Sequence, residues 1–327
     1  SVLDSGNWEH GNNILFIDQW EDDFIKKHQI TREQLHTELN IAKDKLLKER
    51  DKRIRPGLDD KILTGWNAMA IKGLLDAYAA FGDEAFLELA LNNIVFLEKN
   101  LIDKKVHRSF KGKKSPVEGF LEDYAFLIQA YLALYQSTFD EKWLTRANEW
   151  MSYTQSHFYD SEEGYFHFSG NNAEKLIARK KEIFDNVIPS SNGVMARNLF
   201  HLGILLDNSD YQSQAVKMLS SLNELVVGEP AYMSHWGMLY SELVTPMAEV
   251  VIVSPDVKSV AKDFRKNYLP FSLLMGTESQ SELPLLAEKV NPESKAATIY
   301  VCFNKTCKLP VHSVRQALEQ IPAHQKP

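Results

Sequence analysis

Three stretches of the chain repeat one helical pattern, and this repeat restricts the fold more than any other feature of the sequence. They are GDEAFLELALNNIVFLE (82–98), FDEKWLTRANEWMSYTQ (139–155) and NSDYQSQAVKMLSSLN (208–223). Each has an Asp or Asn, then an aromatic residue, then an alanine four positions later; the sets are Asp83/Phe86/Ala90, Asp140/Trp143/Ala147 and Asn208/Tyr211/Ala215. Because residues four apart share a helix face, each stretch predicts a capped helix that packs closely on a neighbour.

Each repeat follows a second helical stretch that is more apolar on all sides. These partners are LTGWNAMAIKGLLDAYAAF (63–81), FLEDYAFLIQAYLALYQSTF (120–139) and SNGVMARNLFHLGILLD (191–207). A helix that is apolar all round is covered on both sides, so the partners are predicted to be inner helices. Short turns make each pair an αα-hairpin, and three hairpins in series predict a solenoid or a closed toroid. The segments that join one hairpin to the next, here called crossings, are longer and contain strand-like patches such as GYFHFSG (164–170). This arrangement favours the α/α toroid.

The pattern changes at the two ends of the chain. Residues 31–52 predict an amphipathic helix that begins with a capping box of Thr31 and Gln34. After residue 245, AEVVIVS (248–254), FSLLMG (271–276) and AATIYVCF (296–303) predict strands, and helices capped by Asp256 and Ser313 follow the first and last of them. We therefore expect a mainly α fold: a partial α/α toroid over residues 1–245, then a small parallel α/β unit over 246–327.

Composition excludes several classes of function. The net charge of −7 argues against a sequence-independent nucleic-acid binder, which normally carries a basic face. No apolar run reaches the length of about 18 residues that a membrane-spanning helix needs. With 2 cysteines, a reducing, cytoplasmic location is expected. The first residues have no basic and apolar leader pattern and read like the middle of a polypeptide, so we expect a fragment.

Polar residues recur at equivalent positions near the starts of the three inner helices. Asn67 precedes its repeat aromatic by 19 positions, Asp123 by 20 and Asn192 by 19. In a toroid these helix starts converge on one mouth of the central funnel, where free N–H groups suit carboxylates and polar ligands. The alternative is that these residues are helix caps, and Asp59 or Asp60 is expected to cap the helix that follows them.

Acidic and aromatic residues near these helix starts predict carbohydrate chemistry. Glycoside hydrolysis needs two carboxylates, and an epimerase needs a general base such as histidine. The residues expected to be catalytic are Asp60, Glu122, Asp123 and His235. Those expected to bind substrate are Asp59, Lys61, Trp66, Asn67, Tyr124, Ser190, Asn192 and Trp236. No phosphate-binding glycine loop or nucleophile elbow is present, and no metal or cofactor is expected.

The cysteines leave several alternatives open. Cys302 and Cys307 are separated by four residues at the end of a predicted strand. They can form a disulfide, a redox pair or half of a metal site, or they can be two ordinary thiols.

Several motifs together resemble a known family. RPGLDDKILTGWNAMAI (55–71), GFLEDYAFLIQAYLALYQSTFDEKWL (119–144), PSSNGV (189–194) and YVCFNKTCKLPV (300–311) are similar to the spermatogenesis-associated protein 20-like, thioredoxin-domain-containing proteins, including the bacterial YyaL type. The resemblance implies a toroid of the six-hairpin glycosidase and sugar-epimerase type, preceded in the full protein by a thioredoxin-like domain. This sequence departs from the family pattern at Ser191, where a glycine is expected.

Two functions follow as expectations. The first is a carbohydrate-binding or carbohydrate-processing toroid that uses the acidic and aromatic cluster at the funnel mouth. The alternative is a non-catalytic helical scaffold attached to a thioredoxin-like domain absent from this chain. The expected partners are a carbohydrate ligand and that thioredoxin-like domain, with no nucleic acid and no membrane.

Overall fold

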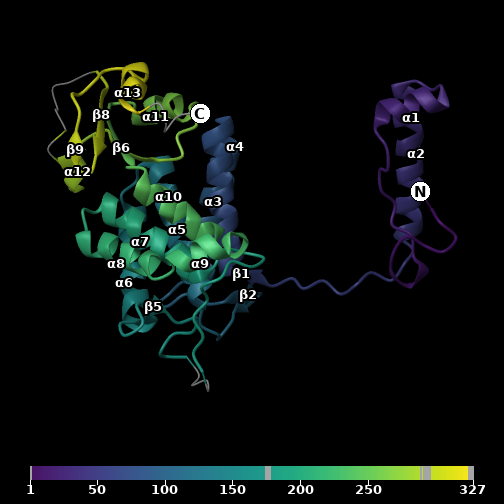
Figure 1. The fold of residues 1–327 in the computed structure, drawn as a ribbon, viewed down its shortest axis with the longest axis horizontal. Helices are drawn as coiled ribbons and strands as arrows, with labels where there is room; N and C mark the ends of the chain where they lie inside the picture. The colour runs from purple at the N-terminus through teal and green to yellow at the C-terminus, as the bar shows by residue number, and fades with distance from the viewer. Residues whose placement is uncertain (1, 174–177, 288, 290–295, 323–327) are drawn as a thin grey trace. The chain divides into compact units, whose positions relative to one another are not determined.

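The computed structural model describes residues 2–173, 178–287, 289 and 296–322, and the chain divides into two compact units after Asp59 (Figure 1). The first unit contains a 3-10 turn, η1 (Glu9–Gly11), and two helices, α1 (Glu21–His28) and α2 (Arg32–Arg50). The predicted capping box of Thr31 and Gln34 starts α2. In α2 only Leu35 is buried, whereas Leu39 is 45% exposed. The apolar face of α2 is therefore left largely uncovered by its own unit.

The second unit contains the three predicted αα-hairpins (Figure 1). They are α3 (Thr64–Phe81) with α4 (Glu84–Asn100), α5 (Leu121–Thr138) with α6 (Lys142–His157), and α7 (Ser191–Leu205) with α8 (Ser209–Ser220). The short α9 (Asn223–Gly228), the 3-10 turn η2 (Pro230–Tyr232) and α10 (Ser234–Val244) follow. No helix among the described residues is both long and apolar enough to span a membrane.

The repeated residues do what their spacing predicts. Asp83 and Asn208 are the N-caps of α4 and α8 and accept hydrogen bonds from the backbone of the first turn. Asp140 lies one residue before the assigned N-cap of α6, but its carboxylate still accepts the Lys142 N–H at 3.1 Å. The three repeat alanines are fully buried, so a partner helix approaches each one closely; they are Ala90, Ala147 and Ala215.

The helices form an inner and an outer layer. The inner helices α3, α5, α7 and α10 contact one another in that order, and α4, α6 and α8 each pack on the inner helix that precedes them. Nearly all of α5 and α7 is buried, because each has an inner helix on both sides and an outer helix behind. The result is an arc of hairpins, which is an open segment of an α/α toroid.

Short strands lie in the segments that lead from one hairpin to the next. β1 (Ile62–Leu63), β2 (Ser109–Lys111) and β3 (Lys113–Lys114) form an antiparallel sheet at the starts of α3 and α5. β4 (Tyr159–Asp160) and β5 (Tyr165–Phe166) form a hairpin before α7, where GYFHFSG predicts strand structure. These crossings bring the chain back to the start of each inner helix.

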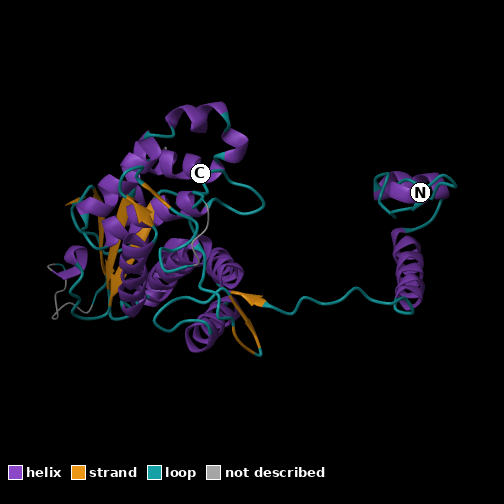
Figure 2. Cartoon of the chain, turned by 90° about the horizontal axis from the view of Figure 1, so that it is seen from below, coloured by secondary structure: helices purple, strands orange, loops and turns teal. Residues whose placement is uncertain are grey.

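The C-terminal α/β unit is present (Figure 2), but its sheet is mixed, which corrects the parallel sheet expected from the sequence. Its elements are β6 (Ala248–Val253), α11 (Val257–Arg265), β7 (Ser272–Thr277), α12 (Pro284–Ala287), β8 (Thr298–Phe303), β9 (Thr306–Cys307) and α13 (Val314–Gln320). The strand order is β7-β6-β8-β9. β6 and β7 are parallel across the α11 crossover, whereas β8 runs antiparallel to β6 and continues into a tight hairpin with β9.

The helical arc and the sheet share side chains at their junction. Phe139, at the C-cap of α5, belongs to the hydrophobic cluster formed by Ala248, Val250 and Ile252 of β6. The domain boundary expected between residues 245 and 246 stays a prediction.

Candidate functional site

Asp123 joins the starts of α3 and α5. Its carboxylate is fully buried and accepts the Gly65 N–H at 2.8 Å and the Phe120 N–H at 2.9 Å. Arg108, from the crossing between the hairpins, donates to both carboxylate oxygens at 2.9 Å. Burial raises the pKa of Asp123 to about 6, because the Arg108 charge and the two backbone donors offset only part of the lost hydration. Asp123 therefore holds two helix starts and a crossing together.

Glu122 lies beside Asp123 and shares the same cation. Its Oε1 is 2.5 Å from Arg108 Nη1, and its side chain is 11% exposed. The Arg108 guanidinium also lies 5.4 Å from the ring centroid of Phe120, which stacks on Phe168. The structure thus brings Glu122 and Asp123 together, but around an arginine of the chain itself.

Tyr124 belongs to an aromatic cluster in the interior. Its ring is fully buried and stacks on Tyr153 with 5.3 Å between centroids. Its hydroxyl donates to Glu118 at 3.1 Å and accepts the Val106 N–H at 3.1 Å. Both hydrogen-bonding functions of Tyr124 are therefore satisfied by the protein.

Asn192 fastens the β4–β5 hairpin to the start of α7. Its amide oxygen accepts the Phe166 N–H at 2.8 Å, and its amide nitrogen donates to the carbonyls of Phe166 and Glu182 at 2.9 and 3.1 Å. The residue is fully buried. The Asn192 amide therefore satisfies the backbone N–H and C=O of Phe166 on the edge of β5 that has no neighbouring strand.

Asp185 links the starts of α7 and α10 in a similar way. Its carboxylate accepts the Ser190 N–H and the His235 N–H, both at 2.8 Å. Trp236 is fully buried and donates from Nε1 to the Ile183 carbonyl at 2.8 Å. Three buried atoms here make no hydrogen bond to described residues: Ser190 Oγ, Ser191 Oγ and His235 Nε2. Burial and the nearby Arg197 charge lower the pKa of His235 to about 4, so its imidazole is neutral at pH 7.

The segment before α3 corrects the expected cap. Helix α3 begins at Thr64 with Leu63 as N-cap and without a side-chain cap, so neither Asp59 nor Asp60 caps it. Both aspartates and Lys61 are exposed, and Asp60 pairs with Lys111 at 2.5 Å. Asp59 and Asp60 lie too far before Thr64 to cap α3, because residues 60–63 form β1 and the segment that leads into the helix.

The two other candidates on α3 differ in exposure. Asn67 donates from Nδ2 to the Leu63 carbonyl at 2.8 Å, which is a bond within the first turns of the helix. Trp66 is 58% exposed. The catalytic and substrate-binding roles expected for the helix-start residues stay predictions, and most of their hydrogen bonds go to the protein backbone.

A different region, the wall formed by the inner helices, encloses a cavity of about 720 Å³. None of the residues expected from the sequence lines it. Its lining comes from α3, α5, α7, α10, α11 and the start of β7; polar members include Lys72, Asp76, Gln129, Gln136, Arg197, Asn198, His201, Glu242, Arg265 and Tyr268. We name it the inner-wall cavity.

A buried carboxylate organises one side of the inner-wall cavity. Glu242 on α10 is 3% exposed and receives Nε and Nη2 of Arg197 at 2.9 and 2.6 Å. His201 Nε2 lies 3.0 Å from its other oxygen and donates to it. Burial acts to raise the pKa of Glu242, but His201 and Arg197 outweigh it and lower the pKa to about 2. The carboxylate therefore fixes the orientation of both the Arg197 and the His201 side chains.

Several polar atoms of this wall remain available. The Gln129 side-chain amide makes no hydrogen bond within the described ranges, and the same holds for Arg197 Nη1 and His201 Nδ1. The sequence expectations missed these residues. A signal was present: Arg197, His201 and Glu242 are charged or ionisable residues inside helices that are predominantly apolar, and the first two are four apart on one face.

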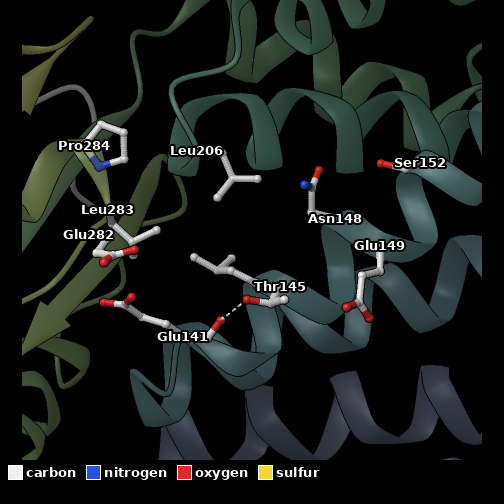
Figure 3. A pocket seen from close by; sticks show the side chains of 10 residues that line it. Glu141, Thr145, Asn148, Glu149, Ser152, Leu206, Glu282, Leu283 and Pro284 are labelled. Carbon is white, nitrogen blue, oxygen red and sulfur yellow. Dashed lines mark hydrogen bonds between the residues drawn. The ribbon is translucent and has the colours of Figure 1, made fainter.

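A second cavity of about 660 Å³ lies between α6, the end of α7 and residues 282–284 (Figure 3). Figure 3 shows Glu141 at the N-cap of α6 and Thr145, Asn148, Glu149 and Ser152 along the helix, with Glu282 on the facing segment. Among its lining residues there are three glutamates and no lysine or arginine. The two cavities therefore differ in charge although their volumes are similar.

The cysteines form a disulfide between β8 and β9. The disulfide excludes two ordinary thiols and half of a metal site in this structure, and it leaves a structural disulfide and a redox pair as the alternatives. Within the described residues, no group of three or more His, Cys, Asp or Glu side chains is placed to hold a metal ion.

Comparison with known proteins gives relatives over nearly the whole chain. No family model matches. The chain is 27% identical to human spermatogenesis-associated protein 20 over 323 residues, which cover 92% of this chain and 41% of that protein. An uncharacterised protein of Caenorhabditis elegans is 27% identical over 98% of this chain and 47% of its own length. The chain thus spans less than half the length of these relatives.

Two solved structures with partly similar arrangements are a mannanase and a sugar epimerase. A GH76 α-mannanase of Bacteroides thetaiotaomicron matches with a TM-score of 0.43 and 21% identity, over 51% of this chain and 46% of that one. A sugar epimerase from a ruminal bacterium matches with a TM-score of 0.41 and 20% identity, over 49% and 43%. By sequence, the chain is a relative of spermatogenesis-associated protein 20, which is the resemblance that its motifs predict.

Proposed function

We propose that the inner-wall cavity binds a carbohydrate, and that the chain belongs to a carbohydrate-binding or carbohydrate-processing protein. The observation that supports this most is the set of available polar atoms on Gln129, Arg197 and His201 around one cavity of about 720 Å³. That volume lies within the range of about 300–1,000 Å³ typical of small-molecule sites.

The chemistry of the lining suits a ligand rich in hydroxyl groups. Each sugar hydroxyl both donates and accepts, and the Gln129 amide offers both functions. Arg197 adds a donor at Nη1. Tyr268, which is 70% exposed and lines the same cavity, offers a ring face to the apolar C–H groups of a sugar. A saccharide is therefore a better match than a purely apolar ligand.

A processing step would depend on His201. Its Nε2 is held by Glu242, which leaves Nδ1 as the atom that can take or give a proton to a bound ligand. His201 replaces His235 in this role, because His235 is not among the residues that line the cavity. The helix-start cluster keeps the role of positioning the loops.

The alternative, a non-catalytic scaffold attached to a thioredoxin-like domain, remains the competing proposal. The thioredoxin-like partner rests on the family resemblance, and a cytoplasmic location rests on the low cysteine count.

A thermal-shift titration with mono- and disaccharides separates the two proposals. We expect at least one sugar to stabilise the chain, since a ligand at 100 times its Kd adds about 2.7 kcal/mol. Gln129→Leu keeps the size of the side chain and should weaken binding by about two- to tenfold through the loss of a hydrogen bond. Ser152→Ala, in the second cavity, is the matched control and should bind like the wild type. No response to any sugar, or an equal response of Gln129→Leu, favours the scaffold.

A further inference from the structure

The β8–β9 hairpin is closed by a covalent bond whose two ends differ in access. Cys302 and Cys307 face each other in the antiparallel ladder and form the disulfide. Cys302 is fully buried, whereas Cys307 is half-buried at the edge of the sheet. Thiol–disulfide exchange requires a thiolate to reach one sulfur, so Cys307 is the sulfur that a thiol in solution can approach.

The turn between the two cysteines has an unfavourable backbone conformation. Asn304 and Lys305 have φ values of 48° and 65°, in the left-handed region. Two-residue hairpin turns of this kind prefer Asn-Gly, because a Cβ at the second position is disfavoured there. Lys305 carries that Cβ, so the turn depends on restraints from its surroundings.

The same turn contacts two other parts of the second unit. The Lys305 N–H donates to the Glu249 carboxylate on β6, with its closer oxygen at 3.2 Å, and Glu249 is 4% exposed. Lys305 Nζ pairs with Asp207, in the turn between α7 and α8. The turn therefore connects the sheet to the third helical hairpin, and the disulfide holds the turn closed.

We propose that the Cys302–Cys307 disulfide is a reducible latch that is opened by a dithiol through attack on Cys307. The thiolate of the dithiol bonds to Cys307 Sγ, the Cys302–Cys307 bond breaks, and Cys302 leaves as a thiolate that takes up a proton. The second thiol of the reductant then displaces Cys307 and forms the reductant's own disulfide, so that two electrons and two protons reach the protein.

Opening the latch changes contacts as well as covalent structure. Without the bond, β9 is a two-residue strand held to β8 by its ladder and by Lys308, whose Nζ lies 5.4 Å from the ring centroid of Phe303. The Asn304–Lys305 turn is then free to leave the left-handed region. Glu249 loses a donor and Asp207 loses a cation, so the contact between the sheet and the α7–α8 turn loosens. This inference is independent of the proposed carbohydrate site.

The site of attack is tested on the oxidised chain. Brief treatment with reduced glutathione, acid quenching and peptide mass spectrometry locate the mixed disulfide. We expect glutathione on Cys307, in at least about tenfold excess over Cys302. Equal amounts, or an excess on Cys302, would overturn the proposed direction of attack.

The consequence is tested by hydrogen exchange. We compare the oxidised chain, the chain reduced with dithiothreitol, and the double variant Cys302→Ser, Cys307→Ser. Amides of residues 304–308 should exchange at least about tenfold faster in the reduced chain and in the double variant, while α5 is unchanged. Dithiothreitol should have no further effect on the double variant. Unchanged exchange in residues 304–308, or loss of protection throughout the unit, would contradict a local latch.

Discussion

The starts of the inner helices and the wall that they form differ in how their polar side chains are used. At the starts, Asp123 and Asn192 are buried and direct their hydrogen bonds to backbone groups of the crossing segments. On the wall, the side chain of Gln129 lines a cavity and has no hydrogen bond among the described residues. A polar residue that recurs in a helical repeat can therefore hold the connecting segments in place, whereas a single polar residue inside an apolar helix can be available to bind a ligand.

The largest expected effect concerns the helix starts. Asp123→Ala removes the buried acceptor of two backbone N–H groups and one of the two carboxylates that face Arg108. Removing one partner of a buried ion pair lowers the free energy of unfolding by about 3–5 kcal/mol, and this loss is measured by urea unfolding. Asp76→Ala is the control on the wall side: Asp76 is 65% exposed and pairs with Lys72, so it should change stability by less than about 1 kcal/mol. Similar losses in both variants would remove the distinction between the two regions.

A second prediction uses pH. The pKa of His235 is lowered from 6.5 to about 4 by burial and Arg197, so its stabilising contribution is complete above pH 6.5 and is lost as pH falls towards 4. This shift corresponds to about 3 kcal/mol. Asp123 acts in the opposite direction, because its raised pKa adds stability as pH falls from about 6 to 3.8.

The difference between the wild type and His235→Gln isolates the histidine from Asp123. The wild type should lose stability relative to His235→Gln as pH falls from 6.5 to 4, in chemical unfolding measured at each pH. Glu242, with its pKa lowered to about 2, adds its own loss only below pH 4.5. Parallel stability curves for the two proteins between pH 6.5 and 4.5 would show that His235 is not held neutral by its surroundings.

A third prediction compares two glycines in inner helices. A Cβ on Gly193, at the start of α7, would lie 2.8 Å from Ser190 Oγ and 3.3 Å from Trp236 Nε1. Gly193→Ala should destabilise the chain by about 1–3 kcal/mol. Gly237 in α10 has no atom within 4 Å of such a Cβ, and Gly237→Ala should stabilise it by up to about 1 kcal/mol. Thermal unfolding that moves the same way in both variants would show that the helix start is not tightly packed.

Much of the fold follows from local signals in the sequence. Asp83, Asn208, Asp256 and Ser313 cap helices where the sequence predicts them, because an N-cap depends on its own first turn. The alternation of inner and outer helices follows from the different distributions of apolar residues. The direction of β8 was not predictable, because strand length and hydrophobicity do not depend on whether a strand is parallel to its neighbour.

The candidate site was harder to predict for a physical reason. Arg197, His201 and Glu242 come from two helices whose residues are 41 or more positions apart, so only the packing of α7 on α10 brings them together. Conversely, the regular spacing of Asn67, Asp123 and Asn192 is real, but spacing does not reveal whether a polar group meets backbone or ligand. Asp59 and Asp60 show the same limit, because a cap must lie at the helix start itself.

The most direct test compares two buried or half-buried amides by urea unfolding, without any ligand. Asn192→Ala removes three hydrogen bonds to backbone groups and should reduce the free energy of unfolding by about 1–3 kcal/mol. Gln129→Ala removes none within the described residues and should change it by less than about 0.5 kcal/mol. Equal losses, or a larger loss for Gln129→Ala, would contradict the assignment of a structural role to the helix starts and of a free, ligand-accessible surface to the inner wall.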